Sequence, residues 1–228
     1  MIGTMTGNGR ERLSPKNFDK ARTLCSDYRS TETKRLNDER RMVMVHRHEL
    51  KHEINYADYL LLKNRLRKIL LHDRHAGPDG EYLVRSLYFD DPFDKALTEK
   101  ISGVNKREKF RIRCYNQDFS WIRLEKKSKR RGLSSKKTAR LTEDQVRSIL
   151  NGEYGFLLES DISLLQEFYF NLQSRLLRPC VIVEYYREPF VFPAGNVRIT
   201  LDRDIRTGGK NIDFFAIDPL HPKLPVNL

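Results

Sequence analysis

Residues Lys109-Phe-Arg-Ile-Arg-Cys-Tyr115 alternate polar and apolar side chains, and this alternation decides the fold. Successive side chains of a β-strand point to opposite faces, so the basic residues and Tyr115 share one face of the predicted strand. Phe110, Ile112 and Cys114 share the other face. The segment therefore predicts a strand that is buried on one side and cationic on the other.

Charged side chains recur with the same period of two in four other predicted strands. One reading is that these are the solvated faces of an antiparallel sheet, as is usual for such strands. The other is that the faces converge, because arginine forks match phosphate oxygens and buried cations need an anionic partner. The co-facial sets are Glu49, Lys51 and Glu53; Trp121, Arg123, Glu125 and Lys127; Tyr185 and Arg187; and Arg198, Thr200, Asp202 and Asp204.

The order of predicted elements indicates an α+β fold. Strands separated by hairpin-length gaps dominate the middle of the chain, and helical patterns flank them, which is typical of an antiparallel sheet with helices. Strands are predicted at 46–54, 82–90, 109–115, 119–127, 133–140, 179–188, 196–206 and 212–217, and helices at 56–71, 93–101, 143–150 and 162–177. Residues 1–45 are polar and are expected to form a disordered tail before a single domain at 46–228.

Positive charge is concentrated in residues 105–140, which hold 14 Lys or Arg and three acids, out of a net charge of +12 for all 228 residues. Such a concentration indicates an anionic partner. Nucleic acid is disfavoured, because the basic run at 126–131 lacks interleaved aromatic side chains and any nucleic-acid module. No run of about 18 apolar residues exists to span a membrane. Three widely spaced cysteines favour a reducing, cytoplasmic location.

Six short segments, in order, resemble the VTC domain, the polyphosphate polymerase domain related to CYTH and triphosphate tunnel enzymes. The resemblance implies an antiparallel β-barrel with flanking helices that encloses a tunnel. It also implies transfer of the terminal phosphate of ATP to polyphosphate with a divalent metal, Mn or Mg. The segments are Glu49-Leu-Lys51, Arg85-Ser-Leu-Tyr-Phe-Asp90, Lys109-Phe-Arg-Ile-Arg-Cys-Tyr115, Leu124-Glu-Lys-Lys127, Glu184-Tyr-Tyr-Arg-Glu-Pro-Phe190 and Arg198-Ile-Thr-Leu-Asp202.

The same resemblance implies which residues bind phosphate. Catalytic roles fall to Arg111, Arg113, Lys127, Arg187 and Arg198. Substrate-binding roles fall to Lys51, Tyr185 and either Lys136 or Lys137, and Lys109 joins them because it shares the face of Arg111 and Arg113.

One feature of the VTC pattern is missing. Members of the family continue into a last strand with a Glu-x-Lys pattern that carries a metal ligand, whereas this sequence ends at Leu228. We therefore expect a truncated tunnel domain and assign no metal ligand. Two alternatives stay open beside the polymerase: a noncatalytic module that binds polyphosphate or nucleotide, and a metal-dependent triphosphatase.

Overall fold

The computed structural model describes residues 49–195, 197–209 and 212–216, all within one compact unit, Met44–Leu228. The predicted tail at 1–45 lies outside the described residues. Within the described ranges, no helix combines the length and the apolar character needed to cross a bilayer.

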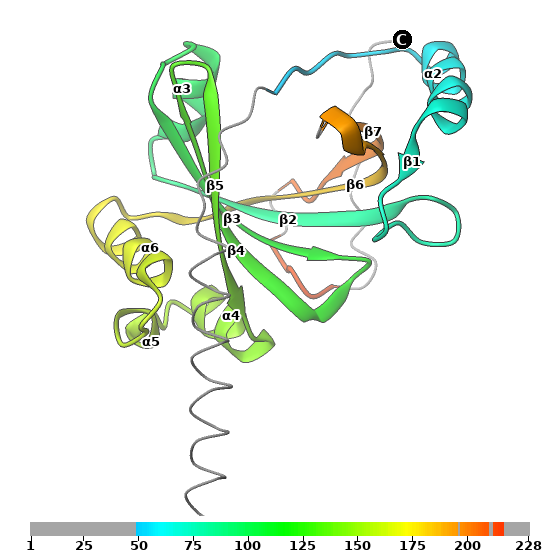
Figure 1. The fold of residues 1–228 in the computed structure, drawn as a ribbon. Coiled ribbons are helices and arrows are strands. Elements are labelled where there is room, and N and C mark those ends of the chain that lie inside the picture. Colours follow the sequence, from blue (N-terminus) through cyan, green and yellow to red (C-terminus); the bar gives the residue numbers. More distant parts are fainter. Residues whose placement is uncertain (1–48, 196, 210–211, 217–228) are drawn as a thin grey trace, which may run out of the picture. The chain divides into compact units, whose positions relative to one another are not determined.

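A curled antiparallel sheet with the form of a half-barrel organises this unit (Figure 1). Its strands run in the order β1-β6-β2-β3-β4-β5, and β7 pairs with the free side of β6. With the helices described below, this confirms the predicted α+β class. The strands are β1 (Leu71–His72), β2 (Tyr82–Asp90), β3 (Arg107–Tyr115), β4 (Asp118–Arg130), β5 (Leu133–Leu141), β6 (Arg178–Phe192) and β7 (Val197–Thr207).

Two tight turns connect the central strands. Asn116 and Gln117 join β3 to β4, and Arg131 and Gly132 join β4 to β5, with positive φ angles at all four positions. Two-residue turns of this kind match the right-handed twist of antiparallel strands, and Asn and Gly tolerate positive φ best. The β4–β5 pairing continues in one register from its turn, whereas an irregularity between Arg113 and Tyr115 shifts the β3–β4 pairing relative to its turn.

The helices gather mainly on one face of the sheet. The apolar face of the central strands is covered by α4 (Glu143–Leu150), α5 (Gly155–Leu158) and α6 (Ser163–Ser174) (Figure 1). The other two helices are not part of this layer: α2 (Tyr56–Ile69) precedes β1 in the chain, and α3 (Lys95–Ile101) follows β2. A capping box at Thr142 and Gln145 fixes the start of α4. We call the face of the sheet opposite α4–α6 the inner face.

The core forms where the apolar side chains of the strands meet α4–α6. The residues predicted to share the apolar face of β3, Phe110, Ile112 and Cys114, are all buried there. Phe168 from α6 packs against Phe110 at a ring-centroid distance of 5.1 Å. Burying this face on helices leaves the opposite, polar face of the same strands available for a ligand.

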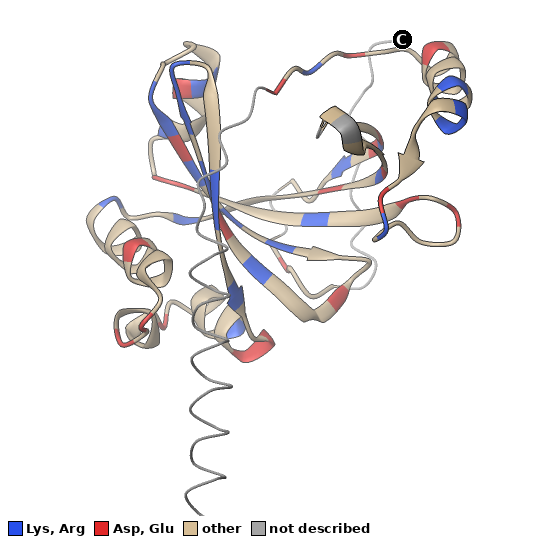
Figure 2. Cartoon of the chain, in the orientation of Figure 1, with Lys and Arg blue, Asp and Glu red and all other residues tan. Residues whose placement is uncertain are grey.

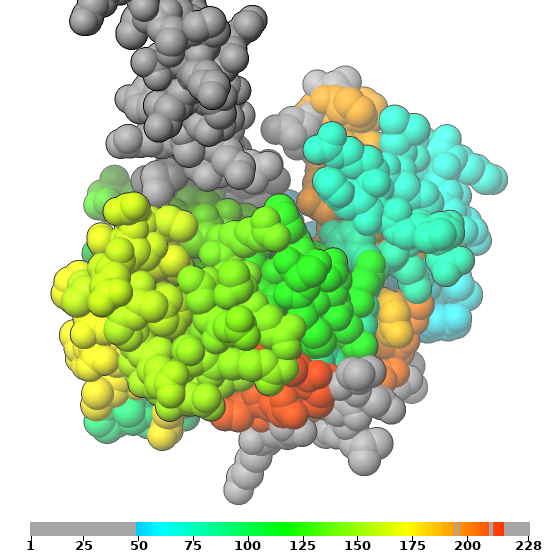
Figure 3. All heavy atoms as spheres, turned by 90° about the horizontal axis from the view of Figure 1, so that it is seen from below, coloured from blue at the N-terminus to red at the C-terminus, as the bar shows by residue number. Residues whose placement is uncertain are grey.

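Residues 212–216 form a turn that is part of this core, not the predicted strand. Phe214 is buried beside Phe119, and the segment lies against the helix-covered side in Figure 3 (red). Arg85 of β2 donates hydrogen bonds to the carbonyls of Phe214 and Ala216 and forms an ion pair with Glu184 at 2.7 Å. The carbonyls of the turn are thus used by a buried arginine and not by a strand ladder.

The strand predicted at 46–54 is also wrong for residues 49–54, which are extended but pair with no described strand. Alternation of charge predicts an extended segment, but a strand also needs a neighbour to complete its backbone hydrogen bonds. The short helix α5 was not predicted, because four residues are too few to show a helical period.

Candidate anion-binding site

Three rows of side chains cross the inner face of β3, β4 and β5. In each row, the three residues are directly paired by the strand register. Adjacent rows are two residues apart along a strand, or about 7 Å. The rows are Lys109, Lys127 and Lys136; Arg111, Glu125 and Thr138; and Arg113, Arg123 and Arg140.

We call these nine residues the cationic face. Seven of them are Lys or Arg, and Glu125 is the only acid among them. Figure 2 shows the Lys and Arg bands following these strands. Like charges directly opposite one another on a sheet destabilise it, so two rows made wholly of cations are unfavourable without a counter-charge. The arrangement suits an extended anion with several negative groups.

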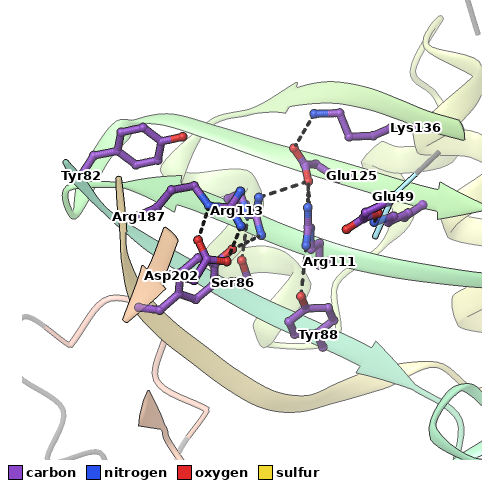
Figure 4. A network of polar contacts seen from close by, with 12 residues as sticks. Glu49, Tyr82, Ser86, Tyr88, Arg111, Arg113, Glu125, Lys136, Arg187 and Asp202 are labelled. Atoms are coloured by element: carbon purple, nitrogen blue, oxygen red, sulfur yellow. Dashed lines mark hydrogen bonds and ion pairs between the residues drawn. The ribbon is translucent and has the colours of Figure 1, made fainter. Parts of the chain in front are cut away.

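Glu125 is the electrostatic centre of the cationic face. Its side chain is fully buried, and its Oε2 accepts hydrogen bonds from Arg111 Nε at 2.8 Å and Nη2 at 2.5 Å. Arg113 and Lys136 form ion pairs with it at 3.9 and 3.3 Å. Burial alone would raise the pKa of Glu125, but the nearby charges of Arg111, Arg113 and Lys136 outweigh it and lower the pKa to about 2. Glu125 therefore stays ionised and holds three cations in place (Figure 4).

Arg113 ties the cationic face to two other strands. Its Nε donates to Ser86 Oγ on β2 at 2.8 Å, and its Nη2 donates to Tyr185 Oη on β6 at 3.2 Å. Tyr88 accepts a hydrogen bond from Arg111 Nη1 at 3.0 Å in the same way. Hydroxyl partners orient the guanidinium groups without adding negative charge, so Glu125 is the one acid that Arg111, Arg113 and Lys136 share among the described residues.

Arg187 and Arg198 extend the positive charge to the β6–β7 wall. Arg187 makes a bidentate ion pair with Asp202 of β7, with both contacts at 2.7 Å, and its guanidinium lies over the ring of Tyr185. Arg198 donates to Tyr82 Oη at 2.9 Å and pairs with Asp73 at 3.0 Å. Figure 4 shows Arg187 and Arg113 approaching the same space from different strands. Arg187 and Arg198 each have an acidic partner of their own, Asp202 and Asp73, whereas Arg111, Arg113 and Lys136 share Glu125.

Lys127, Lys109 and Lys51 differ in their surroundings. Lys127 forms an ion pair with Glu49 from the segment before α2. Lys109 makes no hydrogen bond or ion pair within the described part of the chain, and burial, followed by the charge of Lys100, lowers its pKa. Lys51 is 82% exposed and only 3.8 Å from Glu49. The structure thus brings Lys109 and Lys127 into one row and leaves Lys51 at the edge of the site.

The structure separates Lys136 from Lys137, which the sequence could not rank. Lys136 faces Glu125 on the inner face, whereas Lys137 points to the opposite face, where it pairs with Glu167 of α6 at 3.5 Å. The β4–β5 turn sets this register, and a shift of one residue would exchange the two side chains.

Sequence reasoning assigned no site role to Arg123 and Arg140. Arg123 was placed on the correct face, but Arg140 lies beside it only because of the β4–β5 register. The alternation of the 133–140 segment, counted back from the Arg131–Gly132 turn, is the signal that could have identified Arg140.

Metal ligands do not cluster in the described residues. Nowhere in 49–195, 197–209 or 212–216 do three or more His, Cys, Asp or Glu side chains gather in a way that could hold an ion. The buried acid Glu125 is engaged by three cations. The side chains of this part of the chain therefore do not fit a metal site formed by protein ligands alone.

A separate hollow of about 650 Å³ lies between α2 and the loop at 73–80. Its lining mixes both signs of charge, with Arg67 and His72 close to Asp73 and Asp79. Nearby, buried Glu188 binds Lys63, Arg67 and His72 at 2.9–3.1 Å. These partners satisfy one another, so this region fits a structural role better than an anion site.

The fold and site define an α+β protein whose curled antiparallel sheet carries a cationic inner face. The sequence profile of the VTC domain matches residues 46–223, so the chain belongs to the VTC domain family. A candidate adenylate cyclase from Bacillus halodurans has a crystal structure similar over 72% of this chain and 73% of that chain, with 12% identity and a TM-score of 0.47. A search of curated proteins gave no match.

Proposed function

We propose that this chain binds the phosphates of ATP and of polyphosphate on its inner face and transfers the terminal phosphate to a polyphosphate chain. The observation that carries the proposal is the cationic face, with seven cations and one acid in three paired rows. Membership of the VTC domain family supports the same ligand class. A linear chain of phosphates matches these rows better than a compact anion, because the rows follow one another along the strands.

The proposed roles follow from how each cation is held. Arg111 and Arg113 are fixed by hydrogen bonds and present oriented donors, so we assign them to the transferring phosphoryl group together with Lys127, Arg187 and Arg198. Such preorganised charge stabilises the negative oxygens of the transition state, and phosphoryl transfer needs little covalent chemistry from the protein. Lys109, Lys136, Lys51 and Tyr185 are assigned to substrate binding. Lys137 is left out because it pairs with α6.

Mn²⁺ or Mg²⁺ is part of the proposal, and when bound with the phosphates it would neutralise their oxygens. Because no three-ligand cluster exists in the described residues, we assign no step to it. The same observation favours a second candidate function, a noncatalytic module that binds polyphosphate or nucleotide.

Two measurements on the wild-type chain test the proposal. Calorimetry in EDTA should show tripolyphosphate binding, because the cations suffice to hold phosphates without metal. Incubation with ATP and Mn²⁺ should then give polyphosphate chains, and EDTA should abolish synthesis but not binding. Steady release of inorganic phosphate without chains would assign a triphosphatase, and binding without either product would assign the noncatalytic module. Absence of tripolyphosphate binding would contradict all three readings.

A further inference from the structure

Trp121, Arg123 and Arg140 form a cluster at the end of the cationic face nearest the β3–β4 turn. The guanidinium carbons of Arg140 and Arg123 lie 4.4 and 5.0 Å from the centroid of the Trp121 ring. Trp121 itself is 37% exposed, so the cluster is accessible to a ligand. Aromatic rings attract guanidinium groups and hold them in a defined orientation.

Neither arginine has an acidic partner in the described part of the chain. There, Arg123 lies over the ring and makes no hydrogen bond or ion pair through its side chain, and Arg140 uses one donor on the Ser120 carbonyl at 3.3 Å. Contact with a ring leaves the N–H donors of a guanidinium free to bind elsewhere, because they lie in its plane. This contrasts with Arg187 and Arg203, which also lie over tyrosine rings but pair with Asp202 and Glu81.

The position of the cluster relates it to the central site. Arg123 lies directly opposite Arg113 in the strand register, and Arg140 lies directly opposite Arg123, so three arginines form one row. Placing three like charges side by side is unfavourable unless an anion joins them. A phosphate chain held at Arg111 and Arg113 can therefore continue across the sheet toward β5.

We propose that Arg123 and Arg140, oriented by Trp121, form a second phosphate subsite that binds units of a linear polyphosphate beyond the first three. This inference rests on the proposed function and extends it, because it predicts a preference for long chains over tripolyphosphate. The subsite binds ligand and takes no part in the transfer step.

The test compares two ligands, tripolyphosphate and a long linear polyphosphate, with affinity expressed per phosphate unit. Arg123→Gln/Arg140→Gln should weaken long-chain binding about tenfold, or about 1.4 kcal/mol, and tripolyphosphate binding less than about twofold. Trp121→Leu should also weaken long-chain binding, although it changes no charge. Arg123→Lys/Arg140→Lys should recover only part of the affinity, because lysine keeps the charge but not the fork.

The matched control is Arg147→Gln/Arg175→Gln. Like the Arg123/Arg140 variant, it removes two positive charges, but from the helices on the opposite face of the sheet. One of these two arginines, Arg147, also lies over an aromatic ring, that of Phe215. This control should leave both affinities unchanged. Equal losses of affinity for both ligands in the Arg123/Arg140 variant would place the two arginines in the central site and overturn the proposed subsite. No loss of affinity for either ligand would also overturn it. Those results leave wild-type tripolyphosphate binding and chain synthesis intact, whereas failure of the proposed function would show as loss of one or both in the wild-type chain.

Discussion

Replacing both Arg111 and Arg113 with alanine in a Glu125→Gln chain should weaken tripolyphosphate binding at least about 100-fold relative to Glu125→Gln alone. Each arginine offers charge-assisted hydrogen bonds to phosphate, worth about 1.5–3 kcal/mol apiece, and the two together exceed the roughly 2.7 kcal/mol that 100-fold requires. Calorimetry in EDTA measures the effect. The Glu125→Gln background is necessary because Glu125 is fully buried and depends on both arginines for its charge balance.

The control for this experiment is Arg147→Ala/Arg175→Ala in the same background, which removes two arginines from α4 and from the end of α6. It should bind tripolyphosphate as tightly as its parent. If the Arg111/Arg113 variant is folded and its affinity falls less than about threefold, the two arginines do not hold the phosphates.

Glu125→Gln alone should destabilise the folded chain by about 3 kcal/mol at neutral pH, and the loss should vanish in acid. The pKa of Glu125 in the folded chain is about 2, below its ordinary value of 4.5, so the unfolded chain binds more protons between these values. The contribution of ionised Glu125 to the stability of the folded chain is therefore complete above about pH 4.5 and is lost as the pH falls toward 2. Once protonated, Glu125 is uncharged like the glutamine that replaces it, so the two chains become equivalent.

Urea unfolding of the wild-type and Glu125→Gln chains from pH 7 to pH 3 measures this difference. Subtracting the two curves removes the titration of every other group. Added tripolyphosphate should stabilise the variant at neutral pH, because it supplies the negative charge that the substitution removes. A difference that stays constant down to pH 3, or that grows in acid, would show that Glu125 is not held ionised by Arg111, Arg113 and Lys136.

The alternation of apolar and polar residues predicted most of the sheet, because a strand that is buried on one side needs an apolar residue at every second position. Phe110, Ile112 and Cys114 were assigned to the core from their spacing, and Arg111 and Arg113 to the opposite face. Helix α4 was predicted from its cap at Thr142, a local signal that needs no tertiary contact. Such features depend on neighbours in the sequence, so the sequence contains them.

Features that depend on distant partners were not predicted. The choice between Lys136 and Lys137 required the β4–β5 register, and the role of Arg140 required the same information. The segment at 212–216 has an apolar pattern like a strand, but Phe214 enters the core from a turn whose carbonyls bind Arg85. A period of two shows that side chains alternate, but not which backbone groups they meet.

Lysine acetylation footprinting of the wild-type chain tests the central claim most directly, because it locates the bound phosphates on the surface. Tripolyphosphate should protect Lys109, Lys127 and Lys136, which form one row of the cationic face. Lys68 of α2 and Lys95 of α3 should react at unchanged rates, since neither belongs to that face. Protection of the row alone is the result we predict. An unprotected row, or equal protection of Lys68 and Lys95, would show that phosphates do not bind on the inner face.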